Sequence, residues 1–273
     1  MARYQRKRAR ELKHDRFRDT TLTFLDRLGD QLAGKGRAIL YGIVGLIALA
    51  ILFSLFTSYR ERKANEARRA LGRAIEIAGA PVGADAAAAS ANPTGLSFPS
   101  ERERAQKAVE EFQKVANTYP DPYRENARYF AANNLLALDR NKGINELQAL
   151  TKSGDTEISA LAKFALAQAY EADAKYNEAA MLYGELAKAT NASIPADTAN
   201  LRLAFVYEKL DKKKDAADIL FNIVNNSRKA KGTDGKPAAQ TSAAREAEQK
   251  LETLDPARAA QLPPAPAASN FGF

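Results

Sequence analysis

Residues 38–59 form an unbroken run that contains no charged side chain. The hydrocarbon core of a bilayer, about 30 Å thick, is crossed by roughly 20 apolar residues in a helix. A soluble helix of this length normally keeps a polar stripe, whereas Leu40, Ile47 and Phe53 point in different directions around this one. We therefore expect a transmembrane helix over 38–59, with Arg37 and Arg60 at its two ends, where long basic side chains reach the headgroups.

A cleavable secretion signal is the main alternative to a permanent anchor. Ala48-Leu49-Ala50 has the small-x-small form of a cleavage site. However, the apolar run continues past it to Phe56, and the leader that precedes the run is long for a signal. The segment lengths therefore favour the anchor.

The net charge of +8 is unevenly distributed, because residues 1–37 hold 11 Lys and Arg against 5 Asp and Glu. Cytoplasmic flanks are rich in Lys and Arg, so this tail predicts a cytoplasmic N-terminus and a C-terminal domain on the other side of the membrane. In the sequence close to the run, however, the flank after it is more basic than the flank before it. This narrower count leaves a cytoplasmic domain as an alternative.

The basic tail, residues 1–37, also has apolar residues at roughly helical spacing. They fit an amphipathic helix on anionic lipid, or a solvated leader that only sets the orientation. The folded part is nearly neutral and the tail has few aromatic residues, so we expect lipid rather than nucleic acid as its partner. The apolar residues are Phe17, Leu22, Leu25, Leu28 and Leu32.

Composition favours an all-α protein and gives little support to catalysis. Alanine is abundant, and runs of Val, Ile and Thr are scarce. The chain has no cysteine, and its one histidine, His14, lies in the basic tail. We find no phosphate-binding loop, dinucleotide fingerprint or zinc motif. We therefore expect no enzyme activity, no cofactor, no metal and no small-molecule substrate.

Residues 162–189 and 199–224 are similar to each other. In both, a Leu-Ala pair is followed three positions later by tyrosine, and then by a polar turn and an alanine pair. This pattern resembles the tetratricopeptide repeat, a helix–turn–helix unit in which small side chains lie where two antiparallel helices cross. The matching residues are Leu166, Ala167, Tyr170, Ala179, Tyr183 and Leu186 in the first copy, and Leu203, Ala204, Tyr207, Ala216, Leu220 and Ile223 in the second.

Weaker copies extend the array toward the anchor. Residues 128–150 carry Ala132, Leu135, Ile144 and Leu147 at comparable positions. Residues 105–121 look like a second helix, and residues 60–79, directly after the anchor, supply its first helix. Gly, Pro and Ser interrupt residues 79–100, which we interpret as a loop inserted in this first unit.

The expected organisation is thus a tetratricopeptide-like solenoid at residues 60–226, a linker and capping helix at 227–254, and a mobile Pro/Ala-rich tail at 255–273. A repeat array needs a cap over its last exposed face. Residues 238–254 are the candidate cap, ended by Asp255-Pro256.

Stacked repeats bind proteins on a concave face lined by the first helix of each unit. Projection of the repeat pattern places aromatic, amide and carboxylate side chains there, which suit an extended peptide or a helix of another protein. Phe164 and Leu201 have packing against the next unit as an equal alternative. The residues expected on this face are Tyr129, Asn133, Phe164, Gln168, Glu171, Phe205 and Glu208, together with Leu201.

A basic tail, one span, a helix that runs straight on and a divergent repeat domain resemble the YfgM-like family of ancillary subunits of the Sec translocon. The resemblance implies a protein of the bacterial inner membrane, with its repeats in the periplasm and with translocon subunits and chaperones as partners. The insertion at 79–100 and the Pro/Ala-rich tail depart from that family. A structural scaffold for an envelope assembly machine, in division, pilus or outer-membrane biogenesis, is the alternative function.

Overall fold

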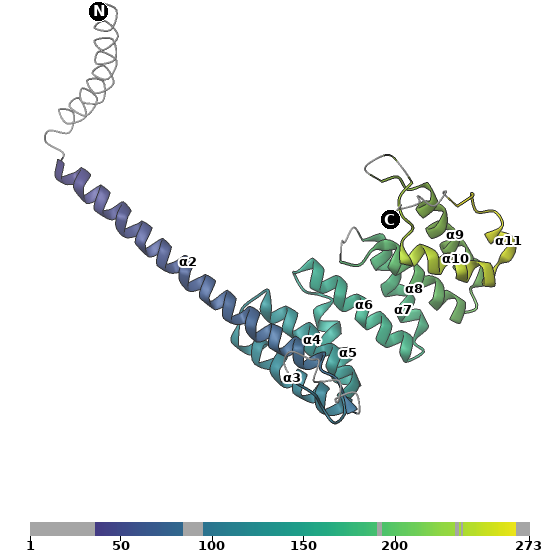
Figure 1. Ribbon diagram of the computed structural model, residues 1–273, viewed down its shortest axis with the longest axis horizontal. Helices are drawn as coiled ribbons and strands as arrows, with labels where there is room; N and C mark the ends of the chain where they lie inside the picture. The colour runs from purple at the N-terminus through teal and green to yellow at the C-terminus, as the bar shows by residue number, and fades with distance from the viewer. Residues whose placement is uncertain (1–35, 84–94, 190–192, 233–234, 236, 266–273) are drawn as a thin grey trace, which may run out of the picture. The chain divides into compact units, whose positions relative to one another are not determined.

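The computed structural model describes residues 36–83, 95–189, 193–232, 235 and 237–265, and the side chains of 37–40 are not described. Most of these residues are helical (Figure 1). Two isolated β-bridges also occur in the described residues, one between Val82 and Phe98 and one between Lys231 and Pro237. The helices are α2 Gly36–Ala78, α3 Glu101–Thr118, α4 Tyr123–Leu138, α5 Arg140–Leu150, α6 Thr156–Ala172, α7 Tyr176–Lys188, α8 Ala196–Lys209, α9 Lys213–Lys229, α10 Ser242–Leu254 and α11 Pro256–Ala259.

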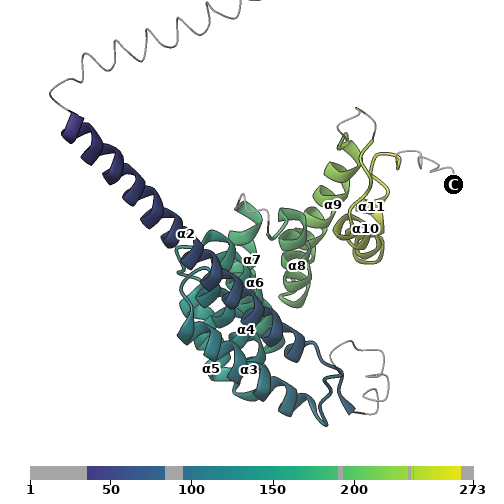
Figure 2. The ribbon, with the colours of Figure 1, turned by 60° about the vertical axis from the view of Figure 1, so that its left-hand side comes forward.

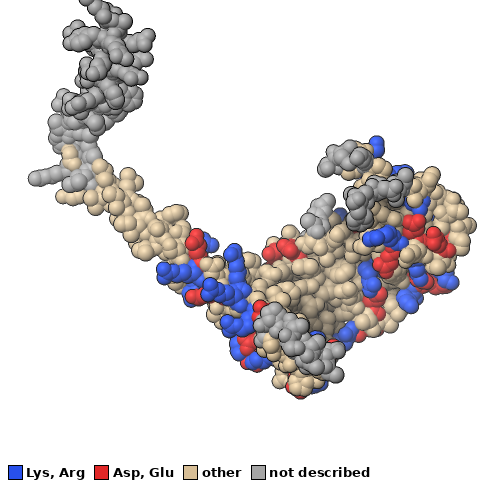
Figure 3. All heavy atoms as spheres, in the orientation of Figure 1, with Lys and Arg blue, Asp and Glu red and all other residues tan. Residues whose placement is uncertain are grey.

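The chain divides into two compact units, Met1–Ala64 and Asn65–Phe273. In the first unit the apolar run belongs to α2, and its large side chains are exposed, including Leu46, Phe53 and Phe56. Figure 3 shows this part of α2 without blue or red spheres, followed by a cluster of blue ones. Among the described helices, α2 is long and apolar enough to cross a bilayer by length and composition.

The second unit is built from helical hairpins, in which each helix packs against the next in the chain (Figures 1 and 2). The pairs α4–α5, α6–α7 and α8–α9 form three hairpins. Before them, α3 packs on α4 and, through Phe112, belongs to a core with Ala74 and Ile77 of α2. The expected all-α class, with tetratricopeptide-like hairpins after one long apolar helix, is therefore confirmed.

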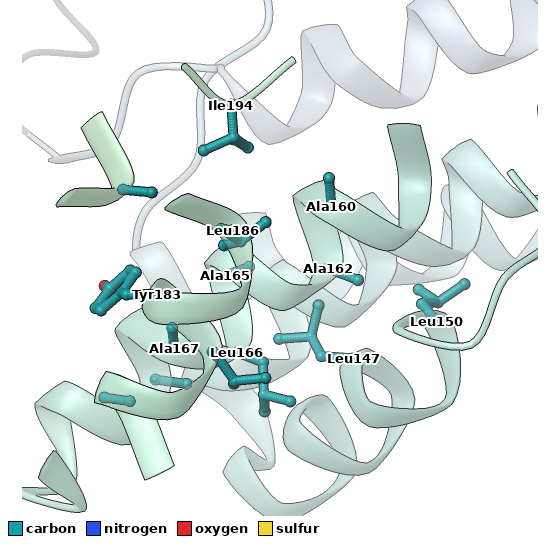
Figure 4. Close-up of a cluster of buried hydrophobic side chains, with 14 of the residues drawn as sticks. Leu147, Leu150, Ala160, Ala162, Ala165, Leu166, Ala167, Tyr183, Leu186 and Ile194 are labelled. Carbon is teal, nitrogen blue, oxygen red and sulfur yellow. The ribbon is translucent and has the colours of Figure 1, made fainter. Parts of the chain in front are cut away.

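The second helices α3, α5, α7 and α9 share one packing register. A small buried residue occupies the point where each meets its neighbour: Ala108, Gly143, Ala179 and Ala216, at nearly constant intervals along the chain. A large side chain without solvent exposure follows one helical turn later in each helix, and two of these side chains, Leu147 and Tyr183, belong to the central core cluster shown in Figure 4. These large residues are Phe112, Leu147, Tyr183 and Leu220.

The turn inside a hairpin is closed by the same device in two units. The backbone N–H of Lys175 donates to the Tyr170 carbonyl at 2.8 Å, across Ala174, which has φ of 56°. The Lys175 ammonium lies 5.6 Å from the centre of the Tyr170 ring. Lys212 and Tyr207 repeat both contacts, at 2.8 Å and 5.2 Å. This is a left-handed helix end of the Schellman type, with a cation–π contact across it.

The end of the array is covered by α10 and the residues after it. Ala244, Ala247 and Leu251 of α10 are buried against α9. Residues 255–265, expected as part of a mobile tail, include the helical turn α11, because Asp255 caps a new helix that begins at Pro256. Leu262 packs on the same core, and Arg228 donates to the carbonyl of Pro263.

Only the ends of the expected insertion 79–100 are described, and they lie together. Val82 pairs with Phe98, and the Arg104 guanidinium donates to the Ala80 carbonyl at 3.2 Å. Residues 84–94, residues 266–273 and the basic tail up to residue 35 lie outside the described residues. The two alternatives for the tail, an amphipathic helix and a solvated leader, therefore lie outside them too.

Candidate binding face

The first helices α4, α6 and α8 carry the side chains that the sequence assigns to the concave face. The structure shows which of them enter the core and which face solvent. Leu201 is buried, with 4% exposure, against α9 and α10. Tyr129 and Phe164 are partly buried against the central cluster. Leu201 therefore packs in the core instead of lining the face, which is the alternative that the sequence left open. Tyr129 and Phe164 also contribute mainly to packing.

Two aromatic pairs fix these partly buried rings. Tyr129 lies edge-on to Phe130, with ring centres 5.4 Å apart, and burial raises the pKa of the Tyr129 phenol. Phe164 lies edge-on to Tyr183 at 5.7 Å. Such pairs add packing energy beyond the area that they bury. Substitution of Tyr129 or Phe164 would therefore disturb the core as well as any binding surface that these side chains help to form.

The two amides of the expected face differ in their surroundings. Asn133 donates from its side-chain amide to the Tyr129 carbonyl, one helical turn back, at 2.8 Å. Gln168 is exposed on α6. Gln168 is thus the better position for a probe, since its side chain faces solvent.

Glu171 joins three helices. Its Oε2 atom accepts from the Arg202 guanidinium of α8 at 2.8 Å and from the Tyr183 hydroxyl of α7 at 3.1 Å. Burial raises the pKa of Tyr183 to about 12, so this hydroxyl stays a donor. Glu171 is therefore a structural acceptor that also holds Arg202 at the surface of α8.

A second carboxylate, on the first helix of the next hairpin, also pairs with a cation. The Lys250 ammonium of α10 lies 2.8 Å and 2.7 Å from the two carboxylate oxygens of Glu208 on α8. The ring of Phe205 lies near both cations, 5.9 Å from the Arg202 guanidinium carbon and 6.0 Å from the Lys250 nitrogen. We call Glu171, Arg202, Phe205, Glu208 and Lys250 the inner row.

The inner row combines an aromatic ring, two cations and two carboxylates on α6, α8 and α10. Its four charged side chains are between 22% and 33% exposed, which leaves each within reach of solvent and of a partner. Arg202 Nε is buried and has no hydrogen-bond partner among the described residues. This chemistry suits recognition of a peptide or a helix through charged and aromatic contacts.

Sequence reasoning named Glu171, Phe205 and Glu208 but missed the two cations. Arg202 and Lys250 each lie far along the chain from the carboxylate that they contact. The two separations differ from each other and from the repeat period, so periodicity does not reveal them. The one available signal was the placement of Arg202 one turn before Phe205 on one helix face.

A groove of about 570 Å³ lies between α5 and α7. It is lined by Tyr170 and Met181, among others, and the Gln148 amide donates to the Tyr170 hydroxyl at 2.6 Å beside it. Within the described residues no group of three or more His, Cys, Asp or Glu is placed to hold a metal ion.

The expected membrane-flanking residues lie on α2. The guanidinium carbon of Arg60 lies 5.7 Å from the centre of the Phe56 ring, so the side chain turns back along the helix toward the apolar run. Arg37 belongs to the first turn of α2, and its side chain is outside the described part.

No family model matches the sequence. No curated protein matches it. Among solved structures, the chain is similar to the nearly identical TPR-like repeats of a kinesin light chain from Podosopora anserina, and to a single-residue variant of that protein. For each, the TM-score is 0.44 and the identity 19%, over 58% of this chain and 81% of the other.

Proposed function

We propose that the protein is a membrane-anchored adaptor that binds a protein partner through the inner row. The observation that carries the proposal is that the centre of the Phe205 ring lies 5.9 Å from the Arg202 guanidinium carbon and 6.0 Å from the Lys250 nitrogen. Aromatic side chains, including phenylalanine, and arginine are enriched at protein interfaces relative to the rest of the surface. An anchor would raise the effective concentration of this face for partners at the membrane. The role proposed is holding, without turnover of a substrate.

The length of α2 supports the anchor. Tyr41 and Tyr59 are exposed and are separated by about 27 Å of helix. This is close to the thickness of the hydrocarbon core, about 30 Å, and tyrosine is enriched at both membrane interfaces. We therefore place one bilayer surface at each tyrosine.

We further propose that the N-terminus is cytoplasmic and that the repeats lie in the periplasm of a bacterium. The basic tail supports this orientation. Protease added to spheroplasts would cleave the repeats of a periplasmic domain. Protection of the repeats until the membrane is dissolved would instead support the cytoplasmic alternative, in which the array is a signalling or localisation scaffold.

The partners proposed are subunits of the Sec translocon and the chaperones that receive emerging chains. The support is the resemblance in layout to the YfgM-like family. The test places a photo-crosslinking amino acid at Gln168, the exposed position expected on the same face as the inner row, and identifies the attached proteins from living cells by mass spectrometry. Asn222, an exposed amide on the second helix α9, is the matched control position.

Crosslinks to translocon subunits and periplasmic chaperones from Gln168, but not from Asn222, would support the proposal. Their loss with Phe205→Ser would assign them to the inner row. Recovery of division, pilus or outer-membrane assembly proteins without the translocon would overturn this partner assignment and support the envelope scaffold. Equal crosslinking from both positions would show that the inner row is not the binding face.

A further inference from the structure

Three cations follow the apolar run within one turn of α2, namely Arg60, Arg62 and Lys63, and we call them the collar. Arg60 and Arg62 are exposed, as is Lys63. At about 3.6 residues per turn, Arg62 and Lys63 lie about 200° and about 300° around the helix from Arg60. Glu61 faces the remaining side. The collar thus occupies an arc of about 160° and presents one basic face of the helix to the surrounding lipid.

The height of the collar matches the headgroup layer. Arg60 and Lys63 are separated by about 5 Å along the axis. The polar layer on each side of a bilayer is roughly 5–7 Å thick, so a span that ends at Tyr59 places all three cations within it. Residues of the repeats are not required for this contact.

Arg60 has a conformation suited to a lipid phosphate. Its guanidinium lies over the Phe56 ring, which brings the charge back to the border of the apolar run. The guanidinium carbon lies 5.7 Å from the ring centre. A guanidinium donates two parallel hydrogen bonds to a phosphate, which gives it a preference for this group.

We propose that the collar binds the phosphate headgroups of anionic phospholipids in the leaflet at the C-terminal end of the span. This inference rests on the proposed membrane anchor. It also accounts for the local excess of basic residues after the span, which opposes the orientation set by the basic tail. In this proposal the collar selects lipid and does not determine the orientation.

The test uses the full chain in nanodiscs of phosphatidylcholine and phosphatidylglycerol. Native mass spectrometry counts the lipids that stay bound when the disc is disrupted. We expect phosphatidylglycerol to be enriched at least about fivefold over its bulk share, the attraction of a single surface cation. The triple variant Arg60→Gln, Arg62→Gln, Lys63→Gln should reduce the enrichment to the bulk ratio.

The matched control is Arg68→Gln, Arg69→Gln, Arg73→Gln, which removes three exposed arginines further along the same helix. It should leave the enrichment unchanged. No enrichment in the unmodified chain, or equal loss in the two triple variants, would overturn the proposal. So would a reversed orientation of the collar variant in cells, measured with an alkaline phosphatase fusion. Release of the unmodified chain by alkaline carbonate would instead refute the anchor itself.

Discussion

Gly143 of α5 packs directly against the backbone of Leu136 in α4. A Cβ atom on Gly143 would lie 2.7 Å from the Leu136 nitrogen and 3.0 Å from the Ala132 carbonyl oxygen. Both neighbours are helical backbone, which cannot move aside as the end of a side chain can. The two helices of this hairpin therefore approach as closely as they do because residue 143 has no side chain.

The first prediction follows from this contact. Gly143→Ala should lower the free energy of unfolding by about 1–3 kcal/mol, because the added methyl group forces the helices apart. Gly184→Ala in α7 is the control, since a Cβ atom there meets no atom within 4 Å. The control should be neutral or stabilising by about 0.4–1 kcal/mol. Urea unfolding of both variants by circular dichroism measures the difference, and equal effects would contradict the close contact.

The repeat architecture was predictable because close packing leaves a regular trace. Ala179 and Ala216 occupy the position of Gly143 in the two clear copies, and their buried neighbours recur at the same offset. The earlier copy was weaker because its two helices are joined by Asp139 alone, so it lacks the longer polar turn of the clear copies, and because Gly143 stands where they have alanine. The helical turn at residues 256–259 was missed because Pro256 also fits the first position of a new helix.

The second prediction concerns pH and Tyr183. Its folded-state pKa of about 12 exceeds the ordinary value of 10, so the folded chain keeps a proton that the unfolded chain loses. The contribution to stability is complete below pH 10 and declines as the pH rises from 10 to about 12. Tyr183→Phe should lower stability at neutral pH by about 1 kcal/mol, through the lost bond to Glu171, and make the alkaline decline less steep.

The measurement is urea unfolding at several pH values for both proteins. The difference between the two curves isolates Tyr183 from the other tyrosines. Parallel curves above pH 10 would show that Tyr183 titrates normally, in contradiction with its burial.

The third prediction concerns the start of α6. Asp155 Oδ1 accepts from the backbone N–H groups of Glu157 at 2.9 Å and Ile158 at 3.2 Å. Asp155→Ala should cost about 1 kcal/mol of stability, because these donors lose their partner. Asp155→Asn keeps an acceptor oxygen and should cost only a few tenths of that. Thermal unfolding of the two variants tests this, and an equal loss in both would assign the effect to charge instead.

The inner row was only partly predictable. The repeat pattern places Glu171, Phe205 and Glu208 on the first helices, because residues at fixed positions share a face. It says nothing about Arg202 and Lys250, whose long side chains reach these carboxylates from another helix. The pattern also does not separate Gln168, which is exposed, from Leu201, which the cap α10 helps to bury.

The fourth prediction separates the stability of the inner row from its binding. Glu208→Lys or Lys250→Glu alone places like charges together and should lower stability by up to about 1 kcal/mol, the range of partly exposed pairs. The double exchange should restore stability, since an ion pair forms again between α8 and α10. The double exchange nevertheless moves the cation of this pair from α10 to α8. A carboxylate then takes the place of the cation on the α10 side of Phe205.

If a partner recognises the cations around Phe205, the double exchange should unfold like the unmodified chain and still lose most of its crosslinking at Gln168. Unfolding by urea and crosslinking in cells, measured on the same four proteins, distinguish these effects. Crosslinking that recovers together with stability would mean that a partner needs only an ordered surface at Phe205. Charge recognition by the inner row would then be wrong, even if the array binds proteins there.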